Sequence, residues 1–170
     1  MGIDPKIEKP TRAMLGHAMR HELQDLAALV DAAGDQVVVG AIGLCVFASG
    51  YIAIDVCERW PTQADLQEIA KSASKSATKL DIDESDICEF LSRVALGQEK
   101  LDDVFTMPKA GMLPLLVTAN LLATFRPREK HWWEYLDQIW DAAETAESTS
   151  LTVLPALMLR ARKQSTPQDD

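Results

Sequence analysis

The chain has 170 residues, of which 47% are hydrophobic and 25% charged, a composition that excludes wholesale disorder and suits one folded domain. Its formal net charge of −9 argues against a general nucleic-acid-binding protein, which needs a dense basic surface to displace counterions from phosphates. The three cysteines are odd in number and follow no metal-ligand spacing, so we expect reduced thiols in a cytoplasmic protein.

A single all-helical domain is expected over residues 11–163, because no good linker divides the chain and no segment alternates convincingly like a surface strand. Residues 1–10 contain two prolines and mixed charges, which favours a flexible N-terminal arm. The polar residues 164–170 are expected to form a disordered tail.

The first predicted helix covers residues 12–33, with Thr11 as its cap and Gly34 at its end. Apolar side chains recur along it at spacings of three and four residues, as on the buried face of an amphipathic helix. These side chains are Leu15, Met19, Leu23, Leu26 and Val30. We therefore expect one continuous helix here.

The next helix is predicted to be the centre of the fold, because residues 37–54 contain no charged side chain and are apolar on all sides. Such a helix must be covered by other helices or by lipid. Gly40, Gly43 and Gly50 share one stripe of it, although each interior glycine costs roughly 1 kcal/mol of helix stability relative to alanine. We interpret this stripe as a site of close helix packing.

A membrane-spanning alternative applies to the same stretch, since residues 37–54 are just long enough to cross a bilayer. Residues 110–125 form a second uncharged run that is slightly too short. Neither run has a basic cluster on one side, which would orient a span. The amphipathic helices around them have the faces needed to cover both in water, so we expect a soluble protein without a membrane partner.

The remaining segments predict further helices. Thr62 and Asp65 resemble a capping box and begin a helix that is expected to reach about Leu80, and an acidic helix start follows near Glu84. Further helices are predicted over residues 113–125, 128–148 and about 152–163. The fold class is therefore all-α, with six to eight helices packed around the buried central helix.

His17 and His21 are spaced one helical turn apart and are weak candidates for a metal site, with Glu22, Glu58 or His131 as further ligands. The segment lacks the internal glutamate of zinc proteases, and two histidines on a partly exposed face are the commoner explanation. No catalytic residue and no cofactor are predicted.

Three other motifs are weaker. The acidic segment 81–86 begins like a calcium loop but lacks the turn glycine and the closing glutamate. The segment 37–43 matches only part of a dinucleotide-binding glycine motif. Lys71, Lys75 and Lys79 form a basic stripe typical of a helix-turn-helix DNA binder, but the neighbouring segment is strongly acidic.

The tryptophans gather in one predicted helix. Trp132 and Trp140 fit its buried stripe, whereas Trp133 lies about 100° away from Trp132 around the helix. Trp133 is thus either packed at the edge of the core or exposed beside Arg126 and Arg128, where it would serve as an interface anchor.

The leading functional hypothesis is a non-catalytic protein-interaction or regulatory module, with Trp133 as its anchor, that associates with itself or with another protein. The alternative is a small-molecule-binding protein or enzyme with a pocket between helices. A helix-turn-helix DNA binder ranks third, and nucleic acid is not an expected partner.

Overall fold

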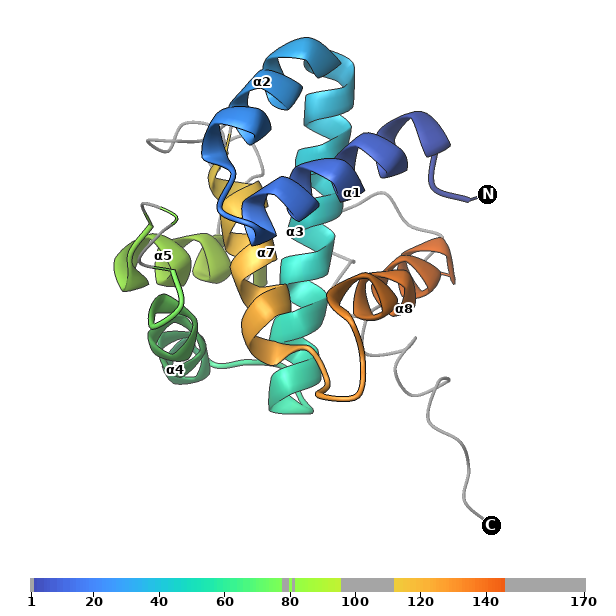
Figure 1. Cartoon of the computed structure of the whole chain (residues 1–170). Coiled ribbons are helices and arrows are strands. Elements are labelled where there is room, and N and C mark those ends of the chain that lie inside the picture. Colours follow the sequence, from blue (N-terminus) through green and yellow to red (C-terminus); the bar gives the residue numbers. More distant parts are fainter. Residues whose placement is uncertain (1, 78–79, 81, 96–111, 146–170) are drawn as a thin grey trace.

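The computed structural model describes residues 2–77, 80, 82–95 and 112–145, and this part of the chain is all-helical (Figure 1). The predicted fold class is therefore confirmed. The helices are α1 (Pro5–Met19), α2 (Leu23–Ala33), α3 (Asp35–Cys57), α4 (Gln63–Ser74), α5 (Glu84–Ala95), α7 (Leu113–Phe125) and α8 (Trp132–Thr145). The last predicted helix and the expected tail lie outside the described residues.

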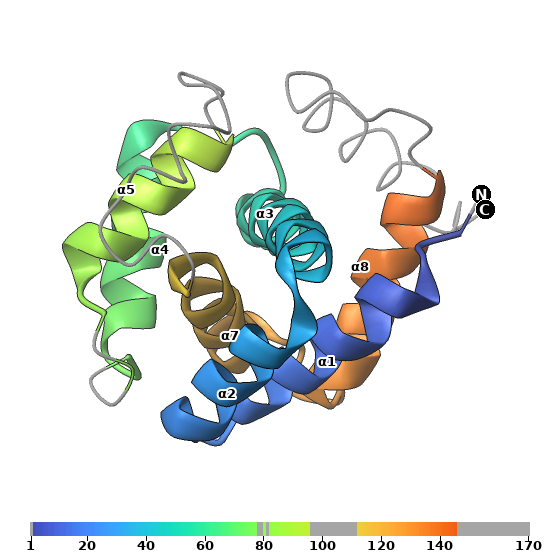
Figure 2. The same cartoon turned by 90° about the horizontal axis from the view of Figure 1, so that it is seen from above.

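Helices α3 and α7 lie side by side at the centre of the fold, with α4 and α5 on one side and α1, α2 and α8 on the other (Figure 2). All residues of α7 from Leu113 to Leu122 are buried, as are most of α3 from Ala41 onward. Two buried polar contacts join the two helices: the hydroxyl oxygens of Ser49 and Thr118 lie 2.9 Å apart, and the Thr118 hydroxyl donates to the carbonyl of Cys45 at 3.1 Å. The expected buried central helix is therefore present and has a second apolar helix as its main neighbour.

By length and composition, α3 is the one helix of the described residues that is apolar enough to cross a membrane, with a mean hydropathy of 2.3. Within the fold, 67% of its most apolar window is buried by other parts of the chain. Burial of this kind is typical of the core helix of a water-soluble protein.

The N-terminal segment differs from the expectation of an arm over residues 1–10, because Pro5 already begins α1. Asp4 caps this helix by accepting a hydrogen bond from the backbone N–H of Lys6 at 2.9 Å. Proline is favoured in the first helical turn, where its missing N–H costs nothing. Thr11, the predicted cap, is instead inside the helix and donates its hydroxyl to the carbonyl of Ile7 at 2.7 Å.

The single helix predicted over residues 12–33 is in fact two helices. The chain turns between Met19 and Leu23, and His21 adopts the left-handed backbone conformation with φ +59°. Both helices direct apolar side chains to the same core, so the three- and four-residue spacing of these side chains continues through the break. Periodicity alone could not reveal the change of direction.

Close packing on the predicted glycine stripe is present at Gly40 but absent at Gly43. A Cβ on Gly40 would lie 2.7 Å from each of two side-chain carbons of Ile7 in α1. A Cβ on Gly43 would have no neighbour within 4 Å. Gly50 is buried in α3. The neighbour at Gly40 is thus a side chain rather than the backbone that the stripe predicted.

Local signals placed several helix starts correctly, although α8 begins at Trp132 rather than at the predicted residue 128. The Thr62–Asp65 capping box is confirmed, and α5 and α7 begin at the predicted residues. Helix α4 ends at Ser74, earlier than predicted, although Ala77 and Leu80 remain buried beyond its end.

Candidate functional site

An open groove of about 460 Å³ lies between α1 and the first turn of α8, and we call it the α1–α8 groove. Three basic or imidazole side chains of α1, the arginine that caps its C-terminal end and two indole rings of α8 dominate its lining. The lining residues are Lys9, Arg12, Ala13, Gly16, His17, Arg20, Trp132 and Trp133. The groove therefore combines positive charge with aromatic surface on a protein whose overall charge is negative.

The two neighbouring tryptophans of the groove have different environments. Trp133 is 44% exposed and stacks on the imidazole of His131, with the ring centres 4.3 Å apart. Trp132 is half-buried and meets Trp133 edge to face at 5.8 Å. Trp140 is buried in the core, as predicted. Of the two interpretations of Trp133, the structure therefore supports exposure at a groove.

The cations of the groove differ in how they are paired. Arg12 joins α1 to α8, because its guanidinium donates to Asp137 at 2.6 Å and to Glu8 at 2.8 Å. Burial alone would lower the pKa of Arg12, but these carboxylates outweigh it and raise that pKa. Lys9 is exposed and has no ion pair with any described residue. It is the cation most available to an incoming anion.

The floor of the groove is open because residue 16 is a glycine. A Cβ there would lie 3.2 Å from a terminal nitrogen of Arg20 and 3.7 Å from the ring of Trp132. The glycine thus lets Arg20 lie across α1 towards the indole. The Nε of Arg20 donates to Glu22 at 3.0 Å, which raises the pKa of Arg20.

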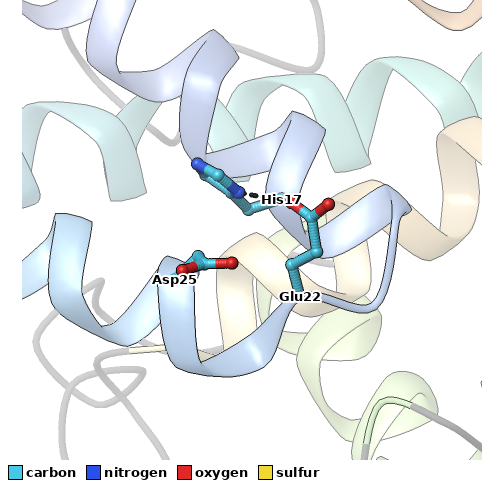
Figure 3. A group of neighbouring side chains, drawn as sticks. All are labelled: His17, Glu22 and Asp25. Carbon is cyan, nitrogen blue, oxygen red and sulfur yellow. Dashed lines mark hydrogen bonds and ion pairs between the residues drawn. The ribbon is translucent and has the colours of Figure 1, made fainter.

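A cluster of possible metal ligands adjoins the groove at the corner between α1 and α2. The Nδ1 of His17 lies 2.6 Å from a carboxylate oxygen of Glu22, and Asp25 faces the same imidazole (Figure 3). Hydrogen bonds from Arg20 and His17 lower the pKa of Glu22. The cluster does not include His21, since the helix ends before it. The predicted pairing of the two histidines is therefore replaced by one histidine with two carboxylates.

No protein-family model, curated protein or solved structure matches the chain. The chemistry of the described residues alone therefore carries the functional argument.

A second hollow of about 350 Å³ lies on the other side of the Arg12–Asp137 ion pair, and we call it the acidic cleft. Its lining is Tyr51, Lys130, Glu134, Asp137, Gln138, Asp141, Ala142 and Thr145. Arg12 lines the α1–α8 groove and Asp137 lines the acidic cleft, so hollows of opposite character lie next to each other.

The weaker motifs find structural explanations. Asp83 and Asp86 exchange side-chain hydrogen bonds with each other's backbone N–H at 3.1 and 2.9 Å, so both acids stabilise the start of α5. Residues 37–43 lie in α3 and form no strand. Residues 75–83 separate α4 from α5, which is longer than the turn of about three to four residues in a helix-turn-helix motif. Lys79 lies outside the described residues.

Cys45 and Cys57 are weak nucleophiles. Burial raises the pKa of the Cys45 thiol to about 12, and the pKa of Cys57 is also raised by burial. Since the thiolate is the reactive form, both side chains stay protonated at neutral pH.

Proposed function

We propose that this chain is a non-catalytic interaction module that associates with itself through the α1–α8 groove and the acidic cleft. The observation that carries the proposal is the 44% exposure of Trp133 at the edge of the groove. Exposed tryptophans beside arginine are typical anchors of protein interfaces, because they bury a large apolar area and lose little side-chain entropy. The three free cysteines agree with a module in a reducing compartment such as the cytoplasm.

Charge complementarity favours a second copy of the chain as the partner. In a twofold dimer the same patch of both copies meets itself, so adjacent surfaces of opposite charge face each other across the axis. Lys9 and Arg20 at the groove would then face Glu134 and Asp141 at the acidic cleft of the other copy. Such an arrangement sets the orientation of the two copies more than their affinity.

Sedimentation velocity of the full chain tests the proposal. We expect a dimer that weakens when NaCl rises from about 0.05 to 0.5 M, because salt screens exposed charges. Trp133→Ala should weaken the dimer at least about 30-fold, as loss of a hot spot of about 2 kcal/mol would. Trp60→Ala is the matched control, since Trp60 is 37% exposed and lines neither hollow.

A strictly monomeric protein at both salt concentrations would overturn self-association. Equal effects of the two tryptophan variants would show that the dimer uses another surface.

The second candidate function is binding of a small aromatic anion in the α1–α8 groove. Its volume of about 460 Å³ falls in the range typical of small-molecule sites, which is about 300–1,000 Å³. Indole surface and cations together suit a planar, negatively charged ligand. A monomer that retains an organic adduct in native mass spectrometry, and loses it in Trp133→Ala, would favour this function over self-association.

A further inference from the structure

We propose that His17, Glu22 and Asp25 bind one divalent transition-metal ion of the zinc class at the corner between α1 and α2. The site does not depend on the proposed self-association. Its donor atoms come from the last turn of α1, the residue that precedes α2 and the first turn of α2 (Figure 3).

The donor set fits such an ion in number and kind. The nitrogen of His17 and one oxygen from each carboxylate all lie within 4.8 Å of one another. In a tetrahedral zinc site, bonds of about 2.0–2.2 Å place the ligand atoms about 3.4 Å apart. Small side-chain rotations therefore suffice: they separate Nδ1 of His17 from the Glu22 oxygen, now 2.6 Å away, and bring the more distant donors closer. One imidazole with two carboxylates selects zinc or a similar transition metal over Mg²⁺, which prefers oxygen ligands and water.

The turn between the helices holds the ligands together. The backbone N–H of His21 donates to the carbonyl of Ala18 at 3.1 Å, and that of Glu22 donates to the carbonyl of His17 at 2.9 Å. The left-handed backbone of His21 completes the turn and returns the chain over the end of α1. Glu22 makes no capping bond to α2, which leaves its carboxylate beside the imidazole.

The two oxygens of Glu22 have separate partners, which lets an ion enter without removing both contacts. Oε2 faces Nδ1 of His17, and Oε1 accepts from Nε of Arg20. The ion takes the place of the proton shared by Oε2 and Nδ1, while Arg20 keeps Oε1 and orients the carboxylate from outside. The Arg20 side chain is 56% exposed, so its terminal nitrogen near the imidazole can move away from the ion.

The site leaves open positions for water. The side chains of His17 and Glu22 are 28% and 36% exposed, and Asp25 lies at the surface. Three protein ligands with one or more waters make an open coordination shell. We therefore expect saturable binding that is weaker than in a closed structural zinc site.

Isothermal titration calorimetry of the metal-stripped full chain with ZnCl₂ tests the proposal. We expect one ion per chain to bind at concentrations of about 0.1 mM or below, and MgCl₂ to give no comparable signal. His17→Ala should weaken zinc binding by more than the roughly 10- to 100-fold that follows loss of an outer partner. Asp25→Asn should also weaken zinc binding. Because Asp25 is exposed, the substitution should leave the fold intact, so weaker binding would report the loss of a ligand.

The chain offers its own controls in the two other histidines. His21→Asn and His131→Ala should retain zinc binding, because neither imidazole belongs to the cluster and asparagine tolerates the left-handed backbone of residue 21. The proposal is overturned if wild-type protein shows no saturable zinc binding, if His17→Ala binds zinc as tightly as wild type, or if His21→Asn removes binding equally.

Discussion

Replacing Gly40 with alanine should destabilise the protein, whereas the same change at Gly43, less than one turn away, should stabilise it. Both positions lie in α3, and both alanines remove the flexibility penalty of a glycine in a helix. The difference comes from α1. The new Cβ at Gly40 would lie 2.7 Å from Cδ1 and 2.7 Å from Cγ2 of Ile7, whereas the one at Gly43 enters open space.

The magnitude follows from two opposing effects. Better helix propensity contributes up to about 1 kcal/mol of stability to each variant. Overpacking against a neighbour that cannot shift typically costs about 1–3 kcal/mol, and only Gly40→Ala incurs it, at a half-buried contact between α3 and α1. Ile7 cannot easily turn away, because its β-branched side chain is restricted at χ1 and three of its carbons are involved. The two variants should therefore differ in unfolding free energy by about 1–3 kcal/mol.

Urea unfolding monitored by circular dichroism measures this difference through the transition midpoint. A double-mutant cycle isolates the contact, since the shorter side chain in Ile7→Ala removes the clash. In that background, Gly40→Ala should become neutral or stabilising, as Gly43→Ala is in the wild type.

Equal stability of the two glycine variants would refute the packing of α1 on α3 at this point. An interaction energy between Ile7→Ala and Gly40→Ala below about 0.5 kcal/mol would do the same, because residues without contact are additive within that range.

Two further predictions concern the interior of the fold. Thr118→Val should lower the unfolding free energy by about 1–3 kcal/mol, because the buried hydroxyl of Ser49 loses its hydrogen-bond partner. Adding Ser49→Ala should recover part of that stability in urea unfolding. A further loss of stability in the double variant, equal to that of Ser49→Ala alone, would contradict the contact. Alkylation of the native protein, followed by mass spectrometry, should show modification of the partly exposed Cys57 and Cys88 but not of the fully buried Cys45. If Cys45 reacted as fast in the native protein as in denatured protein, its burial in the core would be contradicted.

Local chemistry explains which elements could be predicted from the sequence. The capping box of Thr62 and Asp65 and the apolar run of residues 113–125 depend on interactions within a few residues, and both appear as expected. The burial of Trp140 follows from its position around one helix, whereas that position left both burial and exposure open for Trp133. The all-apolar surface of α3 likewise required burial, and the fold supplies it.

The candidate sites were predictable only in part, because they depend on contacts between side chains that only the turns of the chain bring together. His17 was identified from its residue type, but Glu22 and Asp25 become its neighbours only because the chain turns at His21. Pairing it with His21 assumed a continuous helix. The spacing of apolar residues that supported this assumption indicates which side chains are buried. It does not indicate whether the chain changes direction between them.

The sequence by itself determined the helical class, the central position of α3 and the residues that its neighbours must cover. The tertiary structure decided which surfaces meet. Ile7 packs on Gly40 while Gly43 stays open, and α1 and α8 are brought together around an exposed tryptophan. Hydrophobic burial is non-directional, so a pattern of apolar residues specifies that a face is covered but leaves its partner to the packing of the whole chain.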